Sequence, residues 1–75
     1  MIIKFIEVGR NKTSWKAASP AKDINELEYD WLYSQVKKRG YVMSKYIEFL
    51  LNKDGINGII TAGFHTIGKF KIEQI

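Results

Sequence analysis

The segment GFHTIGKF, from Gly63 to Phe70, comes close to a phosphate-binding pattern. That pattern has two glycines separated by four residues and followed by Lys and then by Ser or Thr. Its amides cradle a phosphate, its lysine neutralises charge, its hydroxyl holds magnesium, and a following helix points its positive end at the anion. Here Phe70 replaces the hydroxyl, and the residues from Lys71 to Ile75 alternate like a strand. We therefore predict no nucleotide site in this segment.

The glycines of this region, Gly58, Gly63 and Gly68, are evenly spaced in a sequence typical of strands. Glycine inside a strand often marks a bulge, a sharp bend or the close approach of another chain segment. We expect these glycines to make room for a large side chain opposite the sheet. Trp15 and Trp31 are the candidates to fill that space.

Residues that could perform catalysis or bind a metal are few. His65 is the only histidine and there is no cysteine, so neither a structural zinc site nor a cysteine nucleophile is expected. Ser44, Thr66 and Asp54 would be the triad partners of His65, but no serine lies in a nucleophile-elbow pattern. A domain of this size also offers little volume for a pocket that excludes water. The sequence predicts a non-catalytic protein with no metal, cofactor or small-molecule substrate.

The segment RGYVMSKY, from Arg39 to Tyr46, partly resembles the signature strand of RNA-recognition domains. There, a basic residue and a glycine precede aromatic residues that stack on bases, although the strand does not directly follow the first helix. The candidate nucleic-acid-binding residues are Lys37, Lys38, Arg39, Tyr41 and Lys45. Lys69 and Lys71 would join this patch if the last strand lay near the helix end. The basic run is also what a helix C-terminus favours, since cations interact well with the helix dipole.

A helix is predicted from about Ile24 to Arg39. Asp23 stands three residues before Glu26, the spacing of a capping box in which each side chain accepts a hydrogen bond from the other residue's backbone amide. Acidic residues lie in the first half of the segment and basic residues in its last turn, as the helix dipole favours. Gly40 follows, at the position where a left-handed cap is expected.

This predicted helix carries two apolar arcs. Ile24, Leu27 and Trp31 form the first arc, and Tyr29, Leu32, Tyr33 and Val36 form the second. Because a sheet covers a helix stripe only about 100° wide or slightly wider, one arc, or the edge of one, is expected to face outward.

The outward tyrosines allow two interpretations. In the first, they sit at the rim of the core with their hydroxyls in water. In the second, Tyr29, Tyr33 and Lys37 bind a protein partner or a second copy of the chain, since aromatic residues are favoured as interface anchors. A protein-binding module is the leading functional hypothesis, and nucleic-acid binding is the alternative.

The remaining segments predict a small antiparallel sheet. Strands are expected at Ile2–Val8, Thr13–Ala18 and Tyr41–Leu51, and the stretch from Gly58 to Ile72 reads as one bent strand or as two. The turns GRNK and NKDG separate them. The fold class is therefore α+β, with four or five strands, one helix across one face of the sheet, and the order ββαββ or ββαβββ.

The composition limits the class of protein. The chain has 75 residues, enough for a single domain, with 45% apolar residues, 27% charged residues and a net charge of +4. Its first ten residues are too short and too charged for a signal-peptide core or a membrane span, so a cytoplasmic protein is expected. The abundance of Ile and Lys suggests an AT-rich coding genome, such as that of a low-GC bacterium or one of its phages.

Overall fold

The computed structural model describes residues 1–73 and confirms the α+β class. It has five strands, one short 3-10 helix and one α-helix. In chain order these are β1 (Ile2–Val8), β2 (Thr13–Ala18), η1 (Ile24–Glu26), α1 (Tyr29–Arg39), β3 (Ile47–Leu51), β4 (Asn57–Ala62) and β5 (His65–Glu73). The sequence left four or five strands open, and the structure has the larger number.

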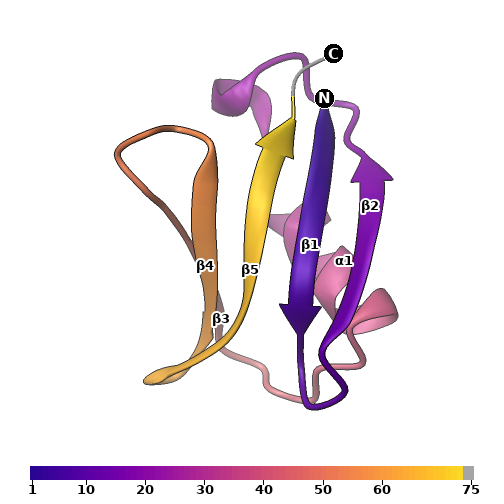
Figure 1. Ribbon diagram of the computed structural model, residues 1–75. Coiled ribbons are helices and arrows are strands. Elements are labelled where there is room, and N and C mark those ends of the chain that lie inside the picture. Colours follow the sequence, from indigo (N-terminus) through magenta and orange to yellow (C-terminus); the bar gives the residue numbers. More distant parts are fainter. Residues whose placement is uncertain (74–75) are drawn as a thin grey trace.

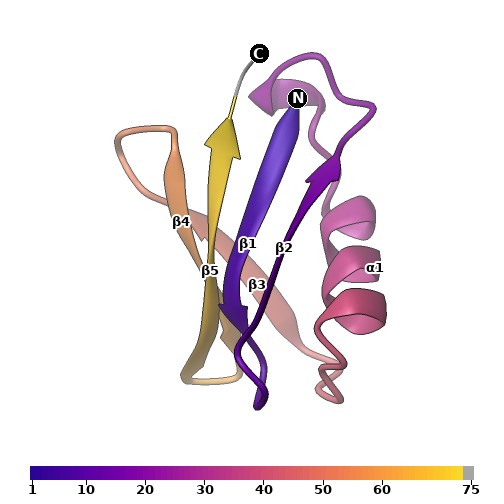
Figure 2. The ribbon, with the colours of Figure 1, turned by 45° about the vertical axis from the view of Figure 1, so that its right-hand side comes forward.

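The strands form one antiparallel sheet in the order β2-β1-β5-β4-β3 (Figure 1). The first and last strands in sequence are therefore neighbours, with Ile2 opposite Glu73 and Phe5 opposite Phe70. The sheet twists strongly, and β3 crosses behind the other strands in Figure 2. Each strand alternates its side chains between two faces, so one face of the sheet holds the core and the other is open.

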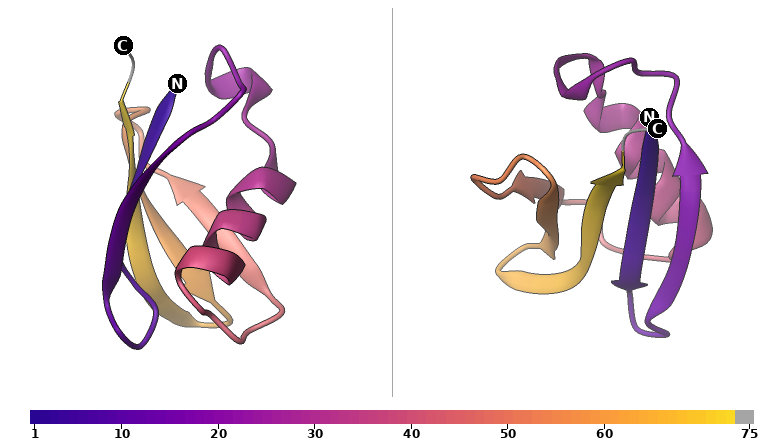
Figure 3. Two further views of the ribbon diagram at one scale, coloured as in Figure 1. Left: turned by 90° about the vertical axis from the view of Figure 1, so that its right-hand side faces the viewer. Right: turned by 45° about the horizontal axis from the view of Figure 1, so that its top comes forward.

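The α-helix covers one face of the sheet, and the two layers are seen edge-on in the left view of Figure 3. Between them lies a single apolar core. Its members are Ile3, Phe5, Val8, Leu32, Val36, Val42, Ile47, Ile60, Phe70 and Ile72. Leu32 and Val36 are the buried residues of α1, so the second predicted arc faces the sheet. Trp15 stacks on Phe5 with ring centroids 4.6 Å apart, and its Nε1 donates to Oε1 of Gln35.

The prediction of one continuous helix from Ile24 to Arg39 is wrong. Asp23 does act as a cap, since its carboxylate accepts from the amides of Asn25 and Glu26, but it caps only the 3-10 turn η1. Leu27 and Glu28 are extended, and α1 begins at Tyr29. The 3-10 turn satisfies its amides over three residues, so the cap does not require a long helix after it.

Gly40 also differs from its predicted role. It has φ −87° and ψ −10°, in the right-handed region, and the left-handed residue is Tyr41, with φ 53°. Space explains the glycine: a Cβ at this position would lie 2.8 Å from the carbonyl oxygen of Val36 and 3.0 Å from Cγ1 of Val8. The helix end thus contacts β1 closely, and the backbone change of direction falls one residue later.

After α1 the chain forms three strands, so the stretch from Gly58 to Ile72 follows the second of its two predicted alternatives. Only Ile47–Leu51 of the predicted strand Tyr41–Leu51 is extended in the sheet, and β4 and β5 are two separate strands. Gly63, with φ 64°, lies in the turn between them. Gln74 and Ile75, the end of the alternating stretch, lie outside the described residues.

Two other glycines make room for neighbours, as predicted, but those neighbours are not the tryptophans. A Cβ on Gly58 would lie 2.3 Å from Cζ of Phe70, and one on Gly68 would lie 2.8 Å from Cγ2 of Val8. The close contacts come from adjacent strands of the sheet, where Phe70 stands directly opposite Gly58.

Candidate functional site

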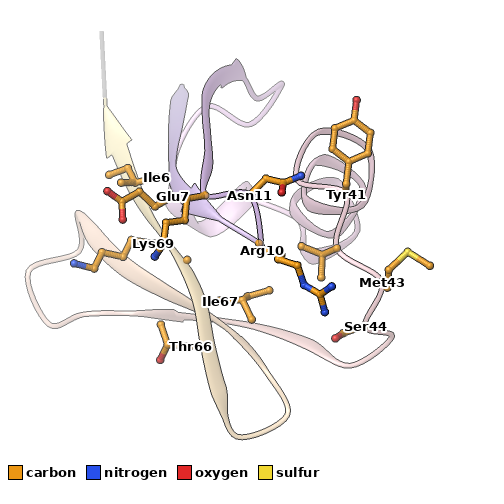
Figure 4. Close-up of a pocket in the computed structure, with 14 residues that line it drawn as sticks. Ile6, Glu7, Arg10, Asn11, Tyr41, Met43, Ser44, Thr66, Ile67 and Lys69 are labelled. Carbon is orange, nitrogen blue, oxygen red and sulfur yellow. The ribbon is translucent and has the colours of Figure 1, made fainter.

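An open groove of about 800 Å³ lies at the end of the sheet where α1 ends. Three segments form it: the bulged end of β1 with the turn that follows, the stretch after α1, and the first half of β5. The lining residues are Ile6, Glu7, Gly9, Arg10, Asn11, Lys12, Tyr41, Val42, Met43, Ser44, Thr66, Ile67, Gly68 and Lys69 (Figure 4). The amide of Gly9 donates to the carbonyl of Ile67 at 2.8 Å and joins the turn to β5.

The backbone of this groove is unusual. Within residues 1–73, the non-glycine residues with positive φ are Glu7, Lys12 and Tyr41, at 48°, 51° and 53°, and all three line the groove. The left-handed conformation costs a residue with a side chain about 1–2 kcal/mol. Backbone strain that the surrounding structure maintains tends to cluster at functional sites. Its concentration here, in two separate segments, marks the groove as the candidate site.

The charge of the groove is mainly positive. Arg10, Lys12 and Lys69 contribute cations and are exposed, and Glu7 contributes one carboxylate. Figure 4 shows the Arg10 side chain extending toward Met43 and Ser44, whereas Lys69 lies on the other side of the groove with Ile6 and Glu7. Both walls of the groove therefore carry a cation, and an anion lying between them would meet positive charge from two directions.

Exposed apolar side chains surround the groove. Tyr41 is 74% exposed and Met43 is 90% exposed, on the segment that joins α1 to β3. On the same segment Tyr46 is 83% exposed, and its carbonyl accepts from the amide of Gly63 at 3.3 Å. That bond brings the fully exposed Phe64 of the β4–β5 turn to the same end of the sheet. Aromatic rings held in water in this way are available to stack on a ligand.

The structure brings some of the predicted nucleic-acid residues together. Tyr41 lines the groove, and Nζ of Lys37 donates to the carbonyl of Ser44, another lining residue, at 2.9 Å. Lys38 and Arg39 are exposed in the last turn of α1, and Lys45 is exposed beyond Ser44. These three do not line the groove.

Arg10 and Lys12 are the residues that the sequence reasoning missed. They belong to the segment GRNK, which was interpreted only as a turn. The signal that could have revealed them is the pair of cations in a turn of a basic protein. Nothing in the sequence places that turn beside Tyr41, because the contact depends on how α1 ends against β1.

The predicted partner-binding residues are used partly inside the fold. The Tyr29 ring packs on Tyr33 and Phe49, with centroids 5.8 Å and 5.7 Å away, and its hydroxyl donates to the carbonyl of Ile47. Burial raises the pKa of Tyr29, and Tyr33 and nearby carboxylates add to the shift. Nζ of Lys37 lies 5.8 Å from the Tyr33 ring centroid. Tyr29 is nevertheless 48% exposed, so the prediction of a partner surface here stays a prediction.

Two of the conceivable catalytic residues, His65 and Asp54, lie apart, whereas Ser44 and Thr66 both line the groove. His65 begins β5 and Asp54 precedes β4, so the two lie at opposite ends of β4. The Asp54 carboxylate accepts from the amides of Ile56 and Asn57 and from the Asn57 side chain, and these bonds hold the pKa of Asp54 below its ordinary value. Across residues 1–73, no three His, Cys, Asp or Glu side chains come together as metal ligands would.

Comparisons with known proteins add no family. No family model, curated protein or solved structure matches this chain. In the described part of the chain, no helix has the length and apolar character needed to cross a membrane. The molecule is a small α+β domain with a basic groove, lined by an exposed tyrosine, at one end of the sheet.

Proposed function

We propose that this protein is a non-catalytic nucleic-acid-binding protein whose groove receives a single strand. The observation that carries the proposal is that Arg10, Lys12 and Lys69 line the same groove as Tyr41, whose ring is exposed. Lysine and arginine bind phosphates and release counterions, and an exposed aromatic ring stacks on a base of any sequence. Positive charge and an exposed ring together are the usual parts of a single-strand site.

A single strand suits this groove better than a duplex does. Reading a duplex requires a helix or a two-stranded ribbon that enters a groove of the nucleic acid. Here the groove is lined by a turn, an irregular segment and part of β5, which lies inside the sheet, and α1 contributes no lining residue. Unpaired bases can be splayed onto Tyr41, whereas bases within a duplex present only their edges.

The test is fluorescence anisotropy with labelled single-stranded DNA and RNA of about sixteen nucleotides over about 50–200 mM salt. The three groove cations contribute about −2 to the slope of log K against log salt, from about 0.7 per phosphate contact. Arg10→Gln with Lys12→Gln should make that slope shallower by about 1.4. Tyr41→Ala should weaken binding at every salt concentration, because it removes stacking and no charge.

Lys53→Gln is the matched control, since Lys53 is an exposed lysine between β3 and β4 and outside the groove. It should leave the slope unchanged. Absence of binding to either nucleic acid at the lowest salt concentration would rule the proposal out, as would an equal loss of affinity in the Lys53 variant. The proposal keeps the expected cytoplasmic location.

The second candidate is binding of a protein partner, or of a second copy, through Tyr29, Tyr33 and Lys37. The observation in its favour is the half-exposed ring of Tyr29, which packs on the ring of Tyr33. Lys37→Glu tests this surface better than loss of the tyrosines, because Tyr29 also holds α1 to β3 through Ile47. Sedimentation that gives the monomer mass at every concentration would exclude the homodimer. Unchanged capture of a protein partner by the Lys37 variant would exclude binding of that partner through this surface.

A further inference from the structure

Three lysines stand side by side on the open face of the sheet, which the helix does not cover. Lys4 on β1 is directly opposite Lys16 on β2 and directly opposite Lys71 on β5. These strands are neighbours at one side of the sheet in Figure 1. Lys16, Lys4 and Lys71, in that order, are the lysine row.

The lysine row concentrates like charges. Neighbouring strands lie about 4.8 Å apart, so the three side chains start within about 10 Å of one another. Like charges directly opposite each other destabilise a sheet. Within residues 1–73, the carboxylate that forms an ion pair with the row is Glu73, whose Oε2 lies 3.6 Å from Nζ of Lys16. Lys4 and Lys71 have no such pair within the described chain, so an external anion would relieve their repulsion.

The lysine row is continuous with the groove. Lys69, which lines the groove, precedes Lys71 by two residues on the same strand and therefore points to the same face. The distance between two such positions is about 6.7 Å along the strand. Positive charge thus extends from Arg10 over Lys69 to the lysine row.

The surroundings of the lysine row indicate what it would contact. Ile6 and Ile59 stand opposite Lys69, and no aromatic residue of β1, β2 or β5 points to this face, since Phe5, Trp15 and Phe70 all face the helix. A ligand here would meet ammonium groups and aliphatic side chains without a ring for stacking. This chemistry fits a phosphate backbone more than it fits bases.

We propose that the strand bound in the groove continues across the open face of the sheet, with its phosphates on Lys69, Lys71, Lys4 and Lys16. The inference rests on the proposed function, and it adds the path that the bound strand follows and the length of the binding site. The groove takes a base onto Tyr41, and the lysine row contributes contacts that are independent of base sequence. Long oligonucleotides therefore bind more tightly than short ones, and the increase depends on the lysine row.

The test uses oligonucleotides of about four and about sixteen nucleotides, which span the known site sizes of small single-strand domains. Lys4→Gln with Lys71→Gln should make the salt slope of the long oligonucleotide shallower by about 1.4, from about 0.7 per lost contact. It should leave the short oligonucleotide unaffected. Lys22→Gln with Lys53→Gln removes the same charge from exposed positions outside both surfaces and should change neither slope.

The outcomes separate the two proposals. If the wild type binds both oligonucleotides and the lysine-row variant keeps the same salt slope, the proposed path across the lysine row is wrong, and the groove remains a binding site. The path is also wrong if the control variant loses as much affinity as the lysine-row variant. It is wrong as well if the lysine-row substitutions weaken binding only to an acidic peptide such as polyglutamate. Failure of the wild type to bind either oligonucleotide overturns both.

Discussion

Tyr41 combines an exposed ring with a left-handed backbone, and this combination permits a sharp test. We expect Tyr41→Gly to be more stable than Tyr41→Ala, although both remove the same ring. Alanine keeps the left-handed cost of about 1–2 kcal/mol at φ 53°, whereas glycine avoids it. Glycine loses about 0.4–1 kcal/mol of this advantage through its greater freedom in the unfolded chain. The difference in the free energy of unfolding between the two variants is therefore about 1 kcal/mol.

That difference is measurable by thermal unfolding followed by circular dichroism. The entropy of unfolding is about 2.1 cal/mol/K per residue, so 1 kcal/mol corresponds to about 6 °C for this chain. Gly63→Ala is the matched control, because Gly63 has φ 64° and nothing lies within 4 Å of the place that an alanine methyl group would take. It should lower the Tm by a similar amount through backbone strain alone.

The two Tyr41 variants also link stability to function. Both should bind single strands more weakly than the wild type, and by the same factor, because neither has the ring. Equal Tm values for the glycine and alanine variants would refute the left-handed strain at this position. A glycine variant that kept full binding would refute the role of the ring.

Three further predictions concern the sheet and its edges. Gly58→Ala should lower stability by about 1–3 kcal/mol, measured by urea denaturation, because its methyl group would overlap the buried Phe70 ring; an unchanged midpoint would contradict that packing. Asp54→Asn should destabilise the protein at neutral pH, and the difference from the wild type should vanish as the pH falls through the lowered pKa of Asp54, below its ordinary value of 3.8; a difference that persisted in acid would refute the ionic origin. Tyr29→Phe should cost about 0.5–1.5 kcal/mol at neutral pH by removing the bond to Ile47. Because the pKa of Tyr29 is raised above its ordinary value of 10.0, the difference in the free energy of unfolding should become smaller only when unfolding is measured above pH 10.

Much of the fold could be predicted because its signals are local. The alternation around Phe70 and Ile72 and the turn sequences GRNK and NKDG depend on a few neighbours, and the structure has a strand and two turns at these places. The start of the helix was predicted wrongly because it was also judged from a local signal. Asp23 is a true cap, but how far a helix continues beyond a cap depends on the packing of Leu27 and Tyr29 against the sheet.

The candidate site was harder to predict from the sequence because it depends on contacts between residues that are distant in sequence. Tyr41 and Lys69 were singled out from the sequence, but Arg10, which lines the same groove, comes from a turn near the start of the chain. The lysine row is set by strand register, and a shift of one residue would turn Lys4 inward. Such registers follow from tertiary packing, which residue spacing alone does not reveal.

The adjacency of β1 and β5 has a consequence for how the chain folds during synthesis. Ile2 pairs with Glu73, so the centre of the sheet closes only after nearly all of the described chain has left the ribosome. Until then the β1–β2 hairpin exposes Phe5 and Ile3 without the strand that completes their layer. The β1–β2 hairpin and the β3–β4–β5 meander form from near neighbours, but joining them requires a long loop to close, which slows folding. The pairing of β1 with β5 is therefore expected to be a late step of folding.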